Sequence, residues 1–262
     1  MPAPAPANTG AAAGDPLDRI RAVRRRAGVF VDFDGTLSEI TAHPDAAVAV
    51  GGAAAVLSKL AGECAIVAVV TGRPAGEVRA KLDVRGMQIL GHYGLEPGAG
   101  DPATDEQAAG VRRAVESAAG AVAGAWVEDK GPSLAVHYRA SASPGEAAAV
   151  LRPLLQRIAA DGGLRLLEGK MVLEVVPADT PGKGTAVARE ARARRLEACL
   201  FAGDDVADLE AFRALDELAA GGIATLRVAV DGPETPADLR AAADEVVDGP
   251  PGLVRLLERL SD

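Results

Sequence analysis

Short apolar runs alternate with segments of helical periodicity along most of the chain. The apolar runs cover 29–33, 65–70 and 88–90 in the first part, and 198–202, 225–230 and 245–247 in the last part. Helical spacing marks 52–61, 185–195, 206–215 and 251–260, and Pro74 is typical of the first turn of another helix. Uninterrupted apolar runs bounded by turn residues are typical of strands buried in a parallel sheet. We therefore predict an α/β core whose parallel sheet is covered by helices on both faces.

The middle of the chain has a different order of elements. Two helical segments, 105–123 and 144–161, are each followed by a pair of strand-like runs. These runs cover 125–128, 133–139, 164–168 and 171–176. Turn residues join the strands of each pair, so we predict hairpins and an αββαββ order. The chain would then divide into a core of 17–102 and 180–262 and an α+β insert of 103–179, preceded by a tail of 1–16 that we expect to be disordered.

Charge and composition restrict the partners of the chain. The formal net charge is −9 and aromatic residues make up 3%, which argues against a nucleic-acid surface. No apolar stretch is long enough to span a bilayer, and the start lacks the pattern of a signal peptide. Cys64 and Cys199 lie in apolar runs without disulfide or CxxC spacing, so we predict buried, reduced thiols. We expect a cytoplasmic monomer that binds a small molecule and neither nucleic acid nor membrane.

Two carboxylates follow the first predicted strand, in the sequence DFDGTL at 32–37. Asp32 can attack phosphorus, and Asp34 can protonate the leaving oxygen and later activate water. Gly35 allows the chain to turn sharply away. Because a carboxylate repels a phosphate dianion, this chemistry needs a divalent cation that holds both. The spacing therefore favours a catalytic loop over a simple acidic turn.

Three further motifs supply the other groups that such a reaction needs. Asp204, Asp205 and Asp208 follow a later strand, and their hard oxygens suit Mg²⁺. Thr71 and the amides that follow it can hold a phosphoryl oxygen at a helix start, and Lys183 can balance negative charge. Taken singly, these residues could be ordinary helix caps or a solvent-exposed lysine. Their position at strand ends, where parallel sheets bind ligands, favours a shared site.

The order of the four motifs resembles that of the haloacid dehalogenase superfamily of phosphatases. The resemblance implies a Rossmannoid parallel core with an inserted cap domain of the C2 type. It implies that Asp32 is the nucleophile and Asp34 the general acid/base, and that Thr71 and Lys183 hold the phosphoryl group. The implied Mg²⁺ ligands are Asp32, the backbone carbonyl of Asp34, and Asp204, while Asp205 and Asp208 are supporting groups.

Several segments also resemble trehalose-6-phosphate phosphatases. These segments are 32–45, 91–96, 127–139 and 169–175, and the first of them contains the HPD motif at 43–45. The resemblance implies hydrolysis of trehalose 6-phosphate to trehalose and phosphate, the last step of trehalose biosynthesis. The residues that we predict to contact the substrate are Arg73, Glu128, Lys130, Arg139, Lys170 and Glu174. Paired Lys and Glu side chains suit sugar hydroxyls, because each hydroxyl both donates and accepts.

Other functions fit much of the same pattern. Sucrose-phosphate and glycosyl-phosphoglycerate phosphatases share the core and the cap position. A phosphomutase would return the phosphate to the sugar, and a sugar-phosphate sensor would bind without turnover. A sensor is disfavoured by the presence of the full set of Asp32, Asp34, Lys183 and Asp204, because binding alone needs no acid/base. We interpret His43, His92 and His137 as structural residues without a catalytic role.

Overall fold

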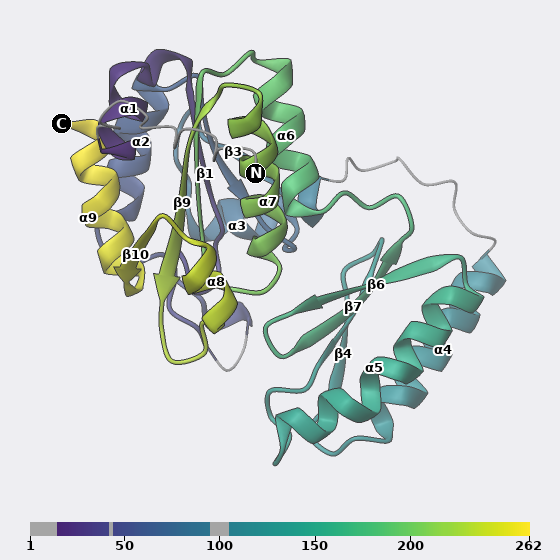
Figure 1. Cartoon of the computed structure of the whole chain (residues 1–262). Coiled ribbons are helices and arrows are strands. Elements are labelled where there is room, and N and C mark those ends of the chain that lie inside the picture. Colours follow the sequence, from purple (N-terminus) through teal and green to yellow (C-terminus); the bar gives the residue numbers. More distant parts are fainter. Residues whose placement is uncertain (1–14, 42–43, 95–104) are drawn as a thin grey trace, which may run out of the picture.

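The computed structural model describes residues 15–41, 44–94 and 105–262, which form two sheets. Figure 1 shows a larger α/β core and a smaller unit, the cap, which extends to one side of it. The elements of the cap lie between residues 105 and 177, so the cap interrupts the core once. None of the helices in the described ranges combines the length and apolar composition needed to cross a membrane.

The core sheet is parallel and has β1 near its centre. Within the described residues its spatial order is β10 (Glu245–Asp248), β9 (Ala224–Asp231), β8 (Ala198–Gly203), β1 (Ala27–Val31), β2 (Ile66–Val70) and β3 (Gln88–Leu90). β1 pairs with β2 on one side and with β8 on the other. Parallel sheets bind ligands at the carboxyl ends of strands where connections diverge in this way. The end of β1 is therefore the expected place for a site.

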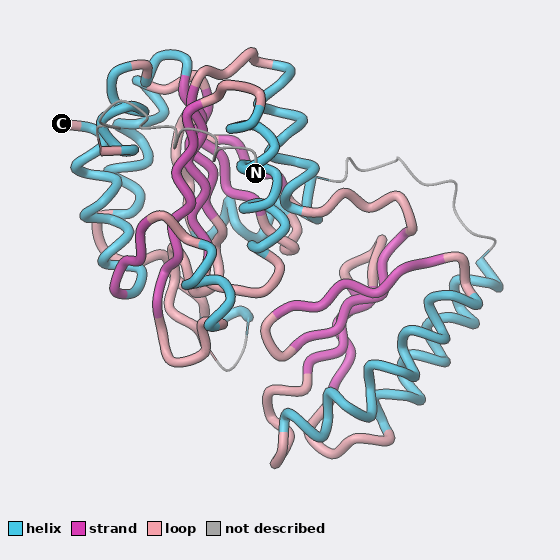
Figure 2. The backbone as a smooth tube through the Cα atoms, viewed as in Figure 1, coloured by secondary structure: helices cyan, strands magenta, loops and turns pink. Residues whose placement is uncertain are grey.

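Helices cover both faces of the core sheet (Figure 2). α1 (Pro16–Ala22), α2 (Ala53–Glu63) and α9 (Gly249–Ser261) pack on one face, and α6 (Lys183–Ala193), α7 (Asp208–Ala220) and α8 (Ala237–Ala242) on the other. Val29 and Val31 of β1 face the first layer, whereas Phe30 faces the second. Burial of both faces explains the uninterrupted apolar runs of these strands. α3 (Ala75–Lys81) and the 3-10 turns η1 (Arg24–Arg26), η2 (Pro44–Ala46) and η3 (His92–Gly94) complete the described core.

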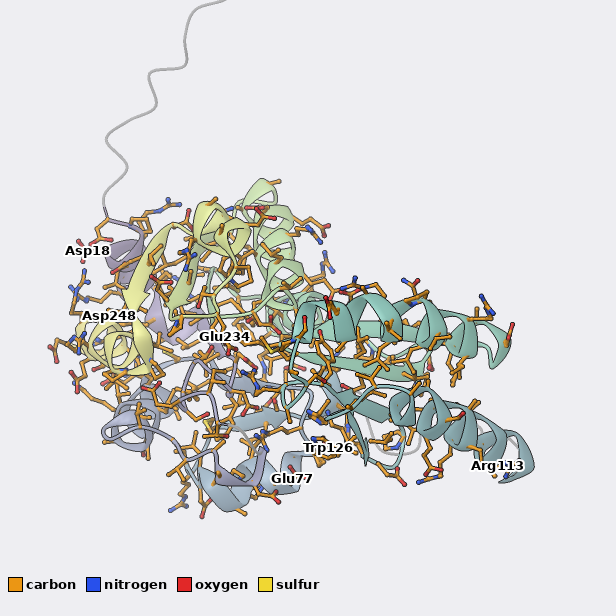
Figure 3. The ribbon with its side chains drawn as sticks, turned by 90° about the horizontal axis from the view of Figure 1, so that it is seen from below. Asp18, Glu77, Arg113, Trp126, Glu234 and Asp248 are labelled. Carbon is orange, nitrogen blue, oxygen red and sulfur yellow. The ribbon has the colours of Figure 1, made fainter. Side chains whose placement is uncertain are left out.

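The cap is an antiparallel sheet with helices on its outer face. The spatial order of its strands, among the described residues, is β4 (Trp126–Asp129), β5 (Leu134–His137), β7 (Val172–Pro177) and β6 (Leu164–Gly169). α4 (Asp105–Gly120) and α5 (Pro144–Asp161) pack against it through residues such as Val136 and Leu173. Alternate residues of the paired strands β4 and β5 point toward the core. Figure 3 shows Trp126 close to where the cap meets the core.

The structure confirms the predicted α/β core with an αββαββ cap. It adds α1 and α8, which lie outside the predicted elements. α1 begins at Pro16, inside the segment expected to be a disordered tail, because the Asp15 side chain accepts a hydrogen bond from the Leu17 N–H at 3.0 Å and Pro16 suits the first helical turn. Cys64 is half-buried rather than buried, Cys199 is buried, and both are free thiols.

Some predictions fall outside the described residues. They concern 1–14 of the predicted tail, His43 of the HPD motif, 95–96 of the motif at 91–96, and the junction near 103 between core and insert. The divisions at 17, 103 and 179 stay predictions.

Candidate active site

Asp32 follows the central strand β1 directly. Its backbone N–H donates to the carbonyl of Ala202 at 2.9 Å, so pairing with β8 continues up to the carboxylate. Gly35 then turns the chain with a φ of +81°, and a Cβ at this position would lie 2.0 Å from Oδ2 of Asp204. A glycine is therefore required on both conformational and steric grounds. This close approach brings the loop after β1 against the loop after β8.

Lys183 connects the acidic residues of both loops. It is the first residue of α6, and its Nζ lies 2.8 Å from Oδ1 of Asp32 and 2.6 Å from Oδ1 of Asp208. Asp208, the first residue of α7, uses Oδ2 to accept hydrogen bonds from the backbone N–H groups of Asp204 at 2.9 Å and Asp205 at 2.8 Å. Asp208 thus positions both the lysine and the loop that carries Asp204.

Burial and like charges shift the pKa values of this cluster. Burial raises the pKa of Asp32 well above its ordinary value, although the Lys183 ammonium opposes the shift. Burial and the Asp208 carboxylate raise the pKa of Asp204 to about 6, against the effect of Lys170. Burial would lower the pKa of Lys183, but Asp208 and Asp32 keep it well above its ordinary value. Additional positive charge would therefore stabilise the ionised carboxylates.

Asp32, Asp204 and Asp208 form an oxygen-rich group that fits a divalent cation. Their ligand atoms lie within 4.8 Å of one another, and all three side chains are buried. Carboxylate oxygens suit a hard cation better than a thiolate-binding metal. The carboxylate of Asp205, a predicted supporting group, lies outside this trio and accepts a hydrogen bond from the N–H of Val206 at 2.6 Å. The roles predicted for Asp205 and for the carbonyl of Asp34 stay predictions.

Arg73 holds the carboxylate of Asp34 in a bidentate ion pair. Its Nε lies 2.6 Å from Oδ2 and its Nη2 2.7 Å from Oδ1. Thr71, at the end of β2, is buried, and its hydroxyl accepts a hydrogen bond from the Arg73 N–H at 3.2 Å. Arg73, which we predicted to contact the substrate, thus contacts the predicted acid/base in this structure. Planar pairing of this kind orients a carboxylate more firmly than a single hydrogen bond.

Two predicted substrate contacts of the cap form ion pairs with the core. Nζ of Lys170 lies 2.6 Å from Oδ2 of Asp204, so a cap cation pairs with the acidic cluster. Nη1 of Arg139 lies 2.6 and 2.9 Å from the two carboxylate oxygens of Glu234, in the loop after β9. These pairs join the cap to the core on one side of the site.

The other predicted cap residues form two smaller networks. The buried Glu174 accepts hydrogen bonds from the hydroxyl of Ser133 at 2.5 Å, from Nζ of Lys130 at 3.3 Å and from the hydroxyl of Tyr93 at 3.2 Å. Glu128 lies with Oε2 2.7 Å from Nε2 of His137, and this hydrogen bond is the main cause of its lowered pKa. These polar groups of the cap are therefore already paired, and Glu174 also pairs with Tyr93 of the core.

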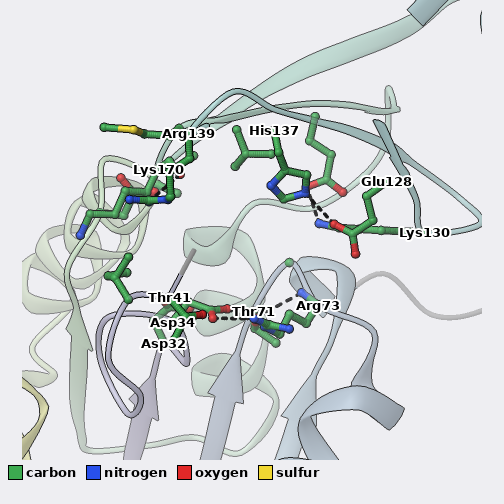
Figure 4. Close-up of a pocket in the computed structure, with 18 of the residues that line it drawn as sticks. Asp32, Asp34, Thr41, Thr71, Arg73, Glu128, Lys130, His137, Arg139 and Lys170 are labelled. Atoms are coloured by element: carbon green, nitrogen blue, oxygen red, sulfur yellow. Dashed lines mark hydrogen bonds and ion pairs between the residues drawn. The ribbon is translucent and has the colours of Figure 1, made fainter. Parts of the chain in front are cut away.

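A cavity of about 240 Å³ lies between these two sets of residues. Figure 4 shows Asp32, Asp34 and Thr71 at the strand ends on one side, with Glu128, Lys130 and His137 on the cap strands opposite. Every predicted site residue except Asp204 and the supporting Asp208 lines this cavity, and Asp204 contacts it through Lys170. The charged core residues thus form the floor of the cavity, and the hydrogen-bonding cap residues form its roof.

The site also contains residues that were not among the predicted site residues, and four of them bear on its chemistry. Ser133, His137 and Tyr93 pair with predicted residues, and Trp126 lines the cavity. The predicted strand at 133–139 could have indicated His137 as a site residue. Alternate residues of a strand lie on one sheet face, and strand pairing places His137 and Ala135 on the same face as Glu128. Tyr93 adopts a left-handed φ of 59°, for which the sequence has no local marker.

Known proteins match much of the sequence of this chain. The chain is 37% identical over 209 residues to an uncharacterized glycosyl hydrolase of Mycobacterium tuberculosis, covering 73% of this chain and 15% of that protein. It is 37% identical over 207 residues to a trehalose-phosphate phosphatase of Mycobacterium marinum, covering 72% and 52%. The chain thus spans about half the length, or less, of these two relatives.

Solved structures share the fold. The carboxyl-terminal domain of a Candida albicans trehalose-6-phosphate phosphatase superimposes with a TM-score of 0.76 at 20% identity, covering 97% of this chain and 99% of that one. A haloacid dehalogenase-like hydrolase of Bacteroides thetaiotaomicron gives 0.59 at 13% identity, covering 89% and 99%. The predicted haloacid dehalogenase-like architecture is therefore confirmed. The trehalose-phosphatase family profile matches residues 30–246, most of the chain, and the protein belongs to that family.

Proposed function

We propose that this protein is a Mg²⁺-dependent phosphatase that hydrolyses trehalose 6-phosphate to trehalose and phosphate. The observation that carries the proposal is the position of Asp32, which contacts Lys183 at the floor of a cavity roofed by polar cap residues. Membership of the trehalose-phosphatase family supports the choice of substrate. In this proposal the core comprises 17–102 and 180–262, and 103–179 is the cap.

The first step would be attack by a carboxylate oxygen of Asp32 on the phosphorus atom. A bond forms between that oxygen and phosphorus, the bond from phosphorus to the sugar oxygen breaks, and Asp34, which enters this step protonated, gives its proton to the departing sugar oxygen. Lys183 offsets the negative charge of Asp32 and the phosphoryl group, and the hydroxyl of Thr71 donates to a phosphoryl oxygen. Arg73, which holds both oxygens of Asp34 in this structure, orients that carboxylate when it is ionised.

The second step would release phosphate from the aspartyl phosphate. Asp34, now ionised, removes a proton from a water molecule, and the water oxygen bonds to phosphorus as the bond to Asp32 breaks. Mg²⁺, held by Asp32, the carbonyl of Asp34 and Asp204, would reduce the repulsion between the carboxylate and the phosphate when bound. The enzyme returns to its starting state with one water consumed.

Selectivity would come from the cap. Glu128, Lys130 and Glu174 line the cavity opposite Asp32, and they carry both donors and acceptors for sugar hydroxyls. A substrate that cannot use these groups would leave them unpaired in a partly buried site, which disfavours its binding. Lys170 and Arg139 lie on the same side of the cavity as the core loop of Glu234. A compact sugar phosphate fits a cavity of about 240 Å³ better than a macromolecule does.

The decisive experiment is phosphate release from trehalose 6-phosphate, sucrose 6-phosphate and glucose 6-phosphate, with Mg²⁺ and with a chelator. We expect metal-dependent release from the trehalose compound in strong preference to the others. Asp32→Asn should abolish turnover while circular dichroism stays unchanged, because the nucleophile is lost and its shape is kept. Preference for another substrate would refute the assignment of trehalose 6-phosphate. Turnover by Asp32→Asn would refute the covalent mechanism, and a sugar bisphosphate product would indicate a mutase.

A further inference from the structure

Trp126 is a large aromatic residue in an unusual place. It is the single tryptophan of the chain, and its exposed fraction is 39%. It begins β4 on the face of the cap sheet that is turned toward the core, and it lines the same cavity as Asp32. Among the described residues, the apolar core of the cap lies on the opposite sheet face, against α4 and α5, and does not include Trp126. Packing within the apolar core of the cap therefore does not explain why a tryptophan occupies this position.

The indole ring is held by its neighbours on β5. Trp126 and His137 are direct cross-strand partners, and their rings are stacked with centroids 4.3 Å apart and an interplanar angle of 13°. Nε2 of His137 lies 2.7 Å from Oε2 of Glu128, so the imidazole itself is fixed. One face of the indole is thus covered, and the ring is oriented before any ligand binds. A rigid aromatic side chain loses little conformational freedom on binding.

The chemistry of such a surface suits a sugar ring. A pyranose carries hydroxyls around its edge and C–H groups on its faces, and the C–H groups are attracted to the electron-rich face of an aromatic ring. Glu128 and Lys130, which line the same cavity, can bond the edge hydroxyls. Apolar area combined with a few fixed polar groups is the usual composition of a small-molecule site.

We propose that Trp126, held by His137, is the surface on which the sugar ring without the phosphate rests. Asp32 lies on the core side of the cavity and His137 on the cap side (Figure 4), so the phosphate would bind at the floor and the second ring near the roof. Trp126 would then distinguish a disaccharide phosphate from a monosaccharide phosphate. This inference rests on the proposed function, because it assumes a disaccharide substrate.

The tryptophan provides its own binding signal. Because the chain has one tryptophan, its emission reports on Trp126 alone. The inactive Asp32→Asn protein, with Mg²⁺ present, is titrated with trehalose 6-phosphate, trehalose, glucose 6-phosphate and inorganic phosphate. We expect trehalose and its phosphate to change the emission, and inorganic phosphate to leave it unchanged. Emission that stays constant while calorimetry shows trehalose 6-phosphate binding would overturn the proposal.

Kinetics of substituted proteins give an independent test. Trp126→Ala should raise KM for trehalose 6-phosphate about tenfold, equivalent to about 1.4 kcal/mol, with kcat changing much less. Trp126→Phe, which keeps an aromatic face, should recover part of the loss. The ratio of kcat/KM for trehalose 6-phosphate to that for glucose 6-phosphate should fall in Trp126→Ala. Val150→Ala, at an exposed apolar residue on α5, is the control for a changed cap surface.

The outcomes separate this inference from the proposed function. Wild-type turnover of trehalose 6-phosphate decides the proposed function. If the wild type prefers this substrate and Trp126→Ala leaves the kcat/KM ratio unchanged, the role of Trp126 is refuted and the function stands. An equal loss on both substrates would also refute it, because that pattern indicates damage to the fold or the core site. A fall in the ratio with partial recovery in Trp126→Phe supports it.

Discussion

At the scale of single residues, Arg73 determines where the carboxylate of Asp34 points. Its guanidinium binds both oxygens of that carboxylate, at 2.6 and 2.7 Å. Arg73→Lys keeps the charge but cannot pair with two oxygens in one plane. We expect kcat for trehalose 6-phosphate to fall by about 10- to 100-fold, part of the factor of about 10² to 10⁴ that acid–base catalysis contributes.

A substrate with a better leaving group shows whether Arg73→Lys acts by misplacing Asp34 or by damaging the active site in general. An aryl phosphate releases a stable phenolate and needs little protonation by Asp34, so Arg73→Lys should slow its hydrolysis much less. The matched control is Arg79→Lys on α3, the helix that begins shortly after Arg73, since Arg79 is exposed to solvent. Equal slowing of both substrates would contradict a role for Arg73 through Asp34.

A second residue-scale prediction concerns the pH dependence of stability. The hydrogen bond from His137 lowers the pKa of Glu128 below its ordinary value of 4.5. The unfolded chain then binds a proton more readily than the folded one, so the free energy of unfolding falls as the pH decreases from about 4.5 through the folded pKa. Glu128→Gln should lose this dependence, with a difference of about 1 kcal/mol above that range. Urea unfolding followed by Trp126 emission at several pH values measures it, and parallel pH profiles would contradict the prediction.

Residues that mark a strand end or a helix start could be predicted from the sequence. Asp32, Asp204 and Lys183 are of this kind, because apolar runs and turn residues show where the elements end. The pairing of Arg73 with Asp34 could not, since it joins side chains 39 positions apart whose rotamers depend on packing. The burial of Glu174 depends likewise on Lys130 and Ser133, which lie in the turn between β4 and β5, and on Tyr93 of η3.

At the scale of elements, the contact between α6 and α7 controls the distance between Lys183 and Asp208. Gly184 permits this contact, because a Cβ there would lie 2.3 Å from the backbone oxygen of Glu210 on α7. Gly184→Ala must push the helices apart, and we expect the free energy of unfolding to fall by about 1–3 kcal/mol. Activity should fall as well, since Lys183 begins α6 and its partner Asp208 begins α7.

The control for this substitution is another helical glycine. A Cβ at Gly110 on α4 would meet nothing within 4 Å, so Gly110→Ala should leave stability unchanged or raise it by about 0.5–1 kcal/mol. Denaturant unfolding and phosphate release measure both effects. If the two substitutions had the same effect, the steric argument for Gly184 would be wrong.

Elements with strong periodicity were predictable, whereas two short helices, α1 and α8, were not. β1, β2 and β8 are buried along their whole length, so no polar residue interrupts their apolar runs. α8 has 6 residues, fewer than two full turns, and cannot show a repeated apolar spacing. α1 has 7 residues and follows a segment rich in Pro and Ala, which hides its start.

At the scale of the whole molecule, side chains distant in sequence hold the cap against the core. Arg139 and Glu234 are 95 positions apart, and Lys170 and Asp204 are 34 apart. Local sequence patterns predicted a cap and a core. No pattern near these four residues indicates which cap residue pairs with which core residue. The Lys170 pair is nearly buried, whereas the side chains of Arg139 and Glu234 are 25% and 33% exposed. Salt therefore screens the second pair more strongly than the first.

Glu234→Gln removes the charge that attracts Arg139 and should let the cap open. A partly exposed ion pair contributes on the order of 1 kcal/mol, so the ratio of open to closed protein should rise about fivefold. Small-angle scattering of the unliganded variant should give a larger radius of gyration, with a weaker dependence on ionic strength than in the wild type. Glu217→Gln, at an exposed position on α7, is the control. Indistinguishable scattering of Glu234→Gln and wild type at every salt concentration would show that this pair does not hold the cap.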